Sequence, residues 1–112
     1  MKKREVNEFG KITYQRTNDG EIFYEYYPNG QVETKSFYRN DKLCRSIKYD
    51  FMGRVIQYKE LLPASTTDLE YKYRLLKCGI RLCIAYGIFR GKHVMCKTVV
   101  DENGMMIPKG GF

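Results

Sequence analysis

The first half of the chain alternates hydrophobic and polar positions with a period of two, which is the spacing of β-strands. Ile22, Tyr24 and Tyr26 share one side of such a strand, and glutamates occupy the other side. The same alternation recurs over residues 32–38 and 43–49. One side of the predicted sheet is therefore mostly apolar and aromatic. The other side is mixed, as expected of an antiparallel sheet with one solvated face.

Turn signals separate these strands at intervals of ten to twelve residues. Each signal is a turn residue followed, after one intervening position, by an aliphatic side chain. The turn residues are Gly10, Gly20, Gly30, Asp41 and Gly53. Asn-Gly and Asp-Gly pairs suit the positive φ angles of the tight turns that join antiparallel strands. We therefore predict an antiparallel β-meander of about five strands over residues 7–62.

The segment after residue 62 predicts a helix. Thr67 and Glu70 have the spacing of a capping box, in which both side chains bind free amides of a helix's first turn. Apolar residues then recur at helical spacing, at Leu69, Tyr73 and Leu76. We expect one helix over residues 68–78 that lies across the apolar side of the sheet.

Strand-like patterns return after Gly79, over residues 80–89 and 93–100, with a tight turn between them. The first of these segments is apolar on both sides, which predicts a central strand. Residues 105–107 form a possible last short strand. The fold class is thus predicted as α+β. A single domain, residues 1–112, would consist of a repeat-like β-meander over 7–62, then a helix and a C-terminal hairpin of two or three strands over 63–112.

Composition narrows the class of protein. A chain of 112 residues is long enough for one domain with its own core. Its start lacks the apolar segment of a signal peptide, and no apolar run is long enough to span a membrane. We therefore expect a cytoplasmic protein whose four cysteines are reduced and which has no contact with a membrane.

The net charge of +7 is concentrated late in the chain. Residues 71–100 contain basic side chains and no acidic one. The basic residues are Lys72, Arg74, Lys77, Arg81, Arg90, Lys92 and Lys97. Such a segment favours nucleic-acid phosphates or an acidic protein surface as partners. Alternatively, these side chains only keep an exposed face soluble.

Few residues have the spacing that a metal site, a phosphate-binding loop or a catalytic site requires. Cys78, Cys83, His93 and Cys96 are zinc-binding residue types, but they lack the closely spaced pairs of structural zinc sites. No phosphate-binding loop, dinucleotide motif or pair of carboxylates is present. We therefore predict no metal, no cofactor and no catalytic residue.

Ten tyrosines among 112 residues are the most unusual feature of the composition. Tyrosine is enriched at interfaces because it combines a rigid apolar ring with a polar tip. Four tyrosines of the predicted meander are candidates for a protein-binding surface: Tyr24, Tyr26, Tyr27 and Tyr38.

Three stretches resemble known repeats. Residues 26–32, Tyr-Tyr-Pro-Asn-Gly-Gln-Val, and residues 37–43 are similar to variant MORN repeats of bacterial proteins. Residues 49–55, Tyr-Asp-Phe-Met-Gly-Arg-Val, look like a YD repeat of the Rhs type. The resemblance covers residues 10–58. It implies a stack of β-hairpins with a scaffolding role, which in some bacterial relatives is an antitoxin or immunity role, and it implies no catalytic residue.

These observations favour a non-catalytic protein-binding module that docks a protein through its tyrosine-rich sheet or an open strand edge. A bacterial or phage accessory role, such as immunity or anti-defence, would suit a small domain of this kind. One alternative is a basic nucleic-acid-binding protein that uses residues 72–97. Another is a small ribonuclease or toxin in which His93 is a general base beside Arg90 and Lys92. An unpaired edge strand would also permit a homodimer.

Overall fold

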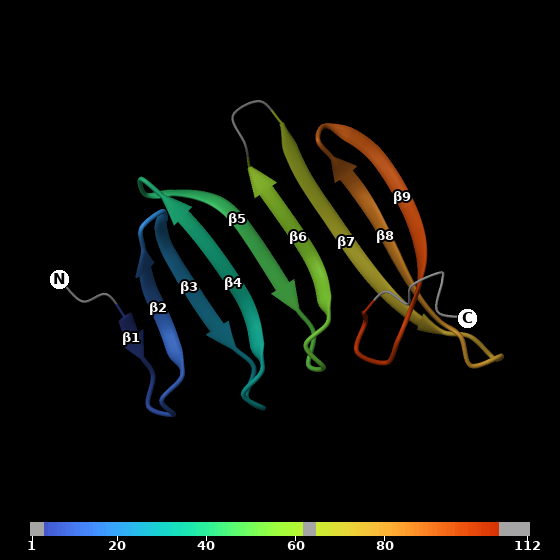
Figure 1. Cartoon of the computed structure of the whole chain (residues 1–112), viewed down its shortest axis with the longest axis horizontal. Coiled ribbons are helices and arrows are strands. Elements are labelled where there is room, and N and C mark those ends of the chain that lie inside the picture. Colours follow the sequence, from blue (N-terminus) through green and yellow to red (C-terminus); the bar gives the residue numbers. More distant parts are fainter. Residues whose placement is uncertain (1–3, 62–64, 106–112) are drawn as a thin grey trace.

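Nine antiparallel strands form one sheet in the computed structural model, which describes residues 4–61 and 65–105. In chain order they are β1 (Arg4–Val6), β2 (Ile12–Thr17), β3 (Gly20–Tyr26), β4 (Val32–Arg39), β5 (Lys42–Tyr49), β6 (Val55–Leu61), β7 (Thr66–Leu75), β8 (Arg81–Phe89) and β9 (Lys92–Val100). Each strand pairs with its neighbours in sequence, so the order in the sheet is the order in the chain (Figure 1). The meander predicted over residues 7–62 is confirmed, and it continues beyond that range.

The described residues contain no helix, so the predicted α+β class is wrong and the protein is all-β there. Residues 68–78, predicted as a helix, form most of β7 and the start of the loop after it. Leu69, Tyr71 and Tyr73 share one face of β7 and alternate with charged residues, which is the period of two of a strand. Leu69 and Tyr73 are also four residues apart, so this pair alone fits the spacing of a helix. Tyrosine and threonine also favour strands over helices.

The two residues of the expected capping box make cross-strand contacts instead. The Thr67 hydroxyl accepts a hydrogen bond of 3.1 Å from the backbone N–H of Arg90, in the turn between β8 and β9. The Glu70 carboxylate accepts one of 2.7 Å from the hydroxyl of Tyr86 on β8. Both polar groups therefore find partners in the neighbouring hairpin, which removes the local reason for a helix to start here.

The turns alternate between two kinds at the two ends of the sheet. At one end, five loops of five residues each place glycine at the fourth position with φ between +77° and +90°. These glycines are Gly10, Gly30, Gly53, Gly79 and Gly104. At the other end, two-residue turns join β2 to β3, β4 to β5 and β8 to β9. The spacing of ten to twelve residues read from the sequence thus covers half of a hairpin repeat, whose loops recur every 20 to 26 residues.

An Asn or Asp side chain closes three of the five-residue loops. Asp50 Oδ1 accepts hydrogen bonds of 2.9 Å from the backbone N–H groups of Met52 and Arg54. Asn7 and Asp101 do the same in the first and last loops. The side chain thus satisfies two amides that the loop leaves without a strand partner.

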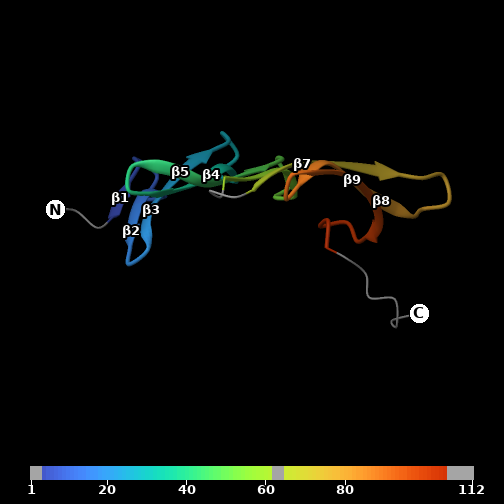
Figure 2. The ribbon, with the colours of Figure 1, turned by 90° about the horizontal axis from the view of Figure 1, so that it is seen from above.

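The sheet is one layer thick (Figure 2). No side chain of the described residues is less than 2% exposed, and four residues fall in the buried class: Thr67, Leu69, Cys83 and Val100. The strand predicted over residues 80–89 is central, since β8 lies between β7 and β9, but its side chains are mostly half-buried rather than enclosed on both sides. The hairpin of β8 and β9 is confirmed. The short strand considered at 105–107 lies mostly outside the described residues.

Gly87 allows two backbones to approach closely in the middle of the sheet. Its φ is +137°, and a Cβ atom there would lie 2.2 Å from the carbonyl oxygen of Asp68 on β7. Gly79, in a five-residue loop, has φ +89° and open space around it. Both positions disfavour an L-residue, but only Gly87 also faces a backbone clash.

We predict that Asp50→Ala lowers the free energy of unfolding by about 1–2 kcal/mol, because two loop amides lose their acceptor. Asp50→Asn retains that acceptor and loses only the partly buried ion pair with Arg54, so it should cost less. Urea unfolding of both variants checks this. Equal losses in the two variants would contradict the capping role.

We also predict that Gly87→Ala destabilises the protein by about 2 kcal/mol more than Gly79→Ala, because only the former forces two strand backbones apart. The comparison by chemical unfolding isolates the clash, since both glycines have positive φ. If the two alanine variants unfold at the same urea concentration, close approach at Gly87 is not important for stability.

Candidate functional site

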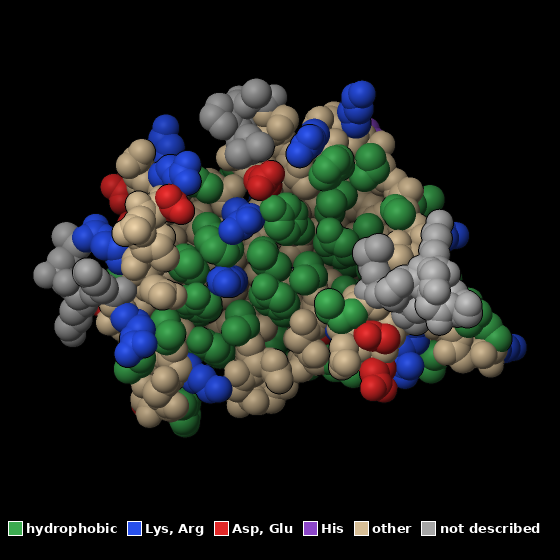
Figure 3. Space-filling model, in the orientation of Figure 1, with side chains coloured by type: hydrophobic (Ala, Val, Ile, Leu, Met, Phe, Trp, Pro, Cys, Tyr) green, Lys and Arg blue, Asp and Glu red, His purple; other side chains and the backbone are tan. Residues whose placement is uncertain are grey.

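One face of the sheet gathers most of the apolar and aromatic side chains. Tyr24, Lys35, Ile47, Tyr58 and Leu69 lie opposite one another on β3 to β7, so their side chains share this face. We call it the aromatic face. Its apolar members in β3–β8 include Ile22, Tyr24, Tyr26, Phe37, Ile47, Tyr49, Tyr58, Leu69, Tyr71, Tyr73, Cys83 and Ala85. In the space-filling view, hydrophobic side chains form a continuous area across the middle of the sheet (Figure 3).

This face has no second layer among the described residues. The strand residues of this face are mostly half-buried rather than enclosed. The chain exposes 8641 Å², whereas a compact monomer of its mass exposes about 6,450 Å². Its radius of gyration is 16.5 Å, against about 13 Å for a compact domain of this length. The structure is therefore an open sheet that leaves an apolar face uncovered.

Several tyrosine hydroxyls tie one hairpin to the next. Tyr73 donates a hydrogen bond of 2.6 Å to the carbonyl oxygen of Val55, and Tyr27 donates one of 2.7 Å to the carbonyl oxygen of Tyr49. Tyr26 likewise donates to the carbonyl oxygen of Ile12. These rings are held in place by their polar tips, so the apolar area between them is preorganised.

Burial raises the pKa of the tyrosines in and beside this face. The groups affected chiefly by burial are Tyr26, Tyr27, Tyr49, Tyr71 and Tyr73. Burial also raises the pKa of the Cys83 thiol, which lies opposite Tyr73 in β8. These side chains therefore stay neutral at physiological pH, as a binding surface of low polarity requires.

Two cations cross the middle of the aromatic face. The ammonium group of Lys35 lies 5.5 Å from the centre of the Tyr24 ring and 5.3 Å from that of Phe37. The guanidinium carbon of Arg45 lies 4.1 Å from the centre of the Phe37 ring. Glu60 is the cross-strand partner of Arg45, so both signs of charge occur near the centre of the face.

The four tyrosines predicted as a binding surface do not all lie together. Tyr24 and Tyr26 belong to the aromatic face. Tyr27 is in a five-residue loop, where its ring lies 4.3 Å from that of Phe51. Tyr38 is on the opposite face, since it pairs with Glu21 and its ring contacts Phe23.

Four further tyrosines of the aromatic face were not among the predicted site residues. They are Tyr49, Tyr58, Tyr71 and Tyr73. The helix prediction hid the last two, because strict alternation from residue 66 to 75 was read with a helical period. Reading residues 66–75 with a period of two would have identified them.

The seven predicted basic residues are divided between both faces and both ends of the sheet. Lys72, Arg74 and Lys97 lie on the opposite face of β7 and β9. Arg81 and Lys92 point to the aromatic face, Arg90 is in the β8–β9 turn and Lys77 is in the loop at the other end. The opposite face of β7 also bears Asp68 and Glu70. The segment without acids in the sequence therefore becomes a surface of mixed sign.

The residues considered for ribonuclease chemistry do not converge. His93 and Lys92 are neighbours in β9 and point to opposite faces, and Arg90 lies against the Phe89 ring. The four cysteines are free. In the part of the chain that the structure describes, no three metal-ligating side chains come together.

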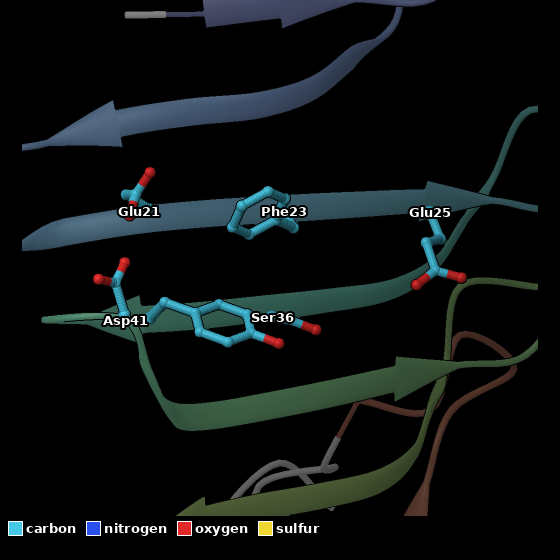
Figure 4. Close-up of a pocket in the computed structure, with 6 residues that line it drawn as sticks. Glu21, Phe23, Glu25, Ser36 and Asp41 are labelled. Atoms are coloured by element: carbon cyan, nitrogen blue, oxygen red, sulfur yellow. The ribbon is translucent and has the colours of Figure 1, made fainter.

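A shallow depression of about 460 Å³ lies on the opposite face over β3 and β4. It is lined by Glu21, Phe23, Glu25, Ser36, Tyr38 and Asp41. Glu21 and Asp41 lie toward one end and Glu25 toward the other, with Phe23 between them (Figure 4). Glu21 accepts a hydrogen bond from Tyr14, and this bond raises the pKa of Tyr14. The three carboxylates suit contact with a cationic side chain.

We predict that stability falls as the pH rises above about 10, the ordinary pKa of tyrosine. The folded chain holds the phenolic protons more tightly than the unfolded chain, so the stabilisation is complete below that pH and is lost above it. Urea unfolding between about pH 8 and 11 measures this. Tyr73→Phe removes one titrating group and should flatten the decline. A decline of equal slope in Tyr73→Phe would assign it to other groups such as lysines.

No helix of the described residues is long and apolar enough to cross a membrane. Two surface features of the described residues suggest a binding function: the aromatic face and the acidic depression on the opposite face. In comparisons with known proteins, no protein-family model, no curated protein and no solved structure matches this chain.

Proposed function

We propose that the protein is a non-catalytic protein-binding module that docks its partner through the aromatic face. The observation that carries this proposal is that the apolar area across β3 to β8 has no cover among the described residues. Monomeric proteins rarely leave so large an apolar area exposed unless it is an interaction surface. A sheet must bury its hydrophobic face against another layer, and a partner can supply that layer.

The composition of the face supports a protein as the partner. Six of the ten tyrosines lie on it, and buried tyrosines are among the residues that contribute most to protein–protein binding. Their hydroxyls are already bound in several cases, so little side-chain freedom is lost on docking. A scaffolding role also fits the stack of hairpins and the resemblance to MORN-type repeats. A cytoplasmic setting fits the four free cysteines.

Nucleic-acid binding is the second candidate, and one observation favours it. Lys72, Arg74 and Lys97 lie close together on the opposite face, and the Lys72 ammonium lies 5.6 Å from the centre of the Tyr86 ring. Cations beside an exposed aromatic ring suit phosphates and stacked bases. Asp68 and Glu70 on the same face weaken this attraction.

We predict that Tyr71→Ala weakens partner binding at least about tenfold, because it removes from β7 one of the rings of the docking face. Tyr86→Ala is the matched control: it removes the same side chain from the adjacent strand on the opposite face. Capture from extracts of the source cells, followed by a titration with the purified partner, measures both. Equal binding by the wild type and Tyr71→Ala would contradict docking at this face.

The same capture separates the two candidates. A stoichiometric protein that survives nuclease treatment supports docking. Captured nucleic acid that is released by salt, and lost in a Lys72/Arg74/Lys97 triple alanine variant, would support the second candidate instead.

A further inference from the structure

The chain exposes more surface than a compact protein of its mass, and the excess has the size that each subunit of an obligate dimer buries. The chain exposes 8641 Å², which exceeds the surface of a compact monomer of its mass by about 2,200 Å². Each subunit of an obligate homodimer buries about 1,000–2,500 Å². A second layer of the same dimensions would therefore return the exposed surface to the range of ordinary folded proteins.

A lone copy also lacks a dry interior. Of the three buried apolar residues on the aromatic face, Leu69 and Cys83 are each still 9% exposed, and Val100 on β9 is 4% exposed. An isolated sheet gains independent stability by packing its hydrophobic face against another element. Two sheets packed face to face enclose a core about 10 Å thick. Association would thus supply the interior that the described residues do not form by themselves.

The two faces of the sheet differ in how many charged side chains would have to be buried in such a core. On the opposite face, β6 to β9 together carry six charged side chains: Lys59, Asp68, Glu70, Lys72, Arg74 and Lys97. On the aromatic face, the same four strands present Tyr58, Leu69, Tyr71, Tyr73, Cys83 and Ala85, with three charged side chains, Glu60, Arg81 and Lys92. Burying the charged face would require desolvation of many ions, so the aromatic face is the one that can become an interior.

The charges at the centre of the aromatic face are compatible with self-pairing. A twofold interface places one surface against itself, so it needs both signs of charge or neither. Lys35, Arg45 and Glu60 lie on β4, β5 and β6, within one strand of the middle of the sheet. Across a twofold axis through this region, Glu60 of one copy can meet a cation of the other copy.

We propose that the occupant of the aromatic face is a second copy of this chain, and that the two sheets pack as a symmetric β-sandwich. This inference rests on the docking function proposed for that face and specifies the partner. Folding and association are then coupled, because the core forms only between two chains.

Sedimentation equilibrium and thermal unfolding of the purified full chain test the pairing. We expect a mass of twice 13.3 kDa and an unfolding midpoint that rises with protein concentration over about a hundredfold range. Added NaCl should strengthen the dimer, since each copy carries a net charge of +7 that the salt screens. A monomeric wild-type chain with a concentration-independent midpoint overturns the proposal, whatever the variants do.

Matched variants locate the interface. Tyr71→Asp on the aromatic face should weaken the dimer at least about a hundredfold, because it buries an unpaired charge in each half of a symmetric interface. Met95→Asp, at a position of the opposite face that is 70% exposed, should leave the dimer intact. A dimer that persists in Tyr71→Asp, or that dissociates in Met95→Asp, would assign the contact to another surface and overturn the face-to-face sandwich.

The outcome also distinguishes this inference from the docking function. If the wild-type chain is a monomer yet a protein partner is lost in Tyr71→Ala, docking stands and self-pairing fails. If the chain is a monomer and Tyr71→Ala changes no binding, both fail.

Discussion

A sheet that is one layer thick cannot hide its side chains from water, and this constraint governs the rest of the molecule. Strand pairing satisfies the backbone, and neighbouring side chains cover one another's flanks. Among the described residues no second layer covers these side chains, so even Leu69 remains partly exposed. Because the hydrophobic effect is proportional to the apolar area removed from water, most of the stabilisation open to the aromatic face depends on another layer.

The hairpin repeat shows how such a sheet stays ordered without a deep core. Each strand pairs with the strand before it and the strand after it, so every strand pair in the meander is formed by sequence neighbours. Glycine loops at one end and tight turns at the other fix the register. Tyrosine hydroxyls link adjacent hairpins, and the side chains of Lys35 and Arg45 lie across rings and shield part of the apolar area. The result is a preorganised surface rather than a closed domain.

The alternation of side chains also decides how charge is distributed. A basic run that looks continuous in the sequence is split by β7, β8 and β9 onto two faces, where acids from β7 lie among the cations. His93 and Lys92 are separated in the same way. Six tyrosines from four strands converge instead, because every second residue of each strand falls on one side. The fold therefore gathers on one face the tyrosines that favour a docking surface. It separates the basic residues and His93, which would have to lie together to bind or cleave a phosphodiester.

The sequence by itself determined the turns and the strands between them, because glycine, asparagine and aspartate encode positive φ locally and period-two alternation encodes a strand. Gly10, Gly30 and Gly53 could be placed for this reason. The sequence did not determine the secondary structure of residues 66–75, because the spacing of Leu69 and Tyr73 fits a helix as well as a strand. Only the tertiary structure decided that segment, because pairing with β6 and β8 satisfies its backbone and gives Thr67 and Glu70 cross-strand partners. The tertiary structure also decided which tyrosines share a face and that this face has no cover among the described residues. Both properties depend on how the strands are arranged together and not on the sequence of any single strand.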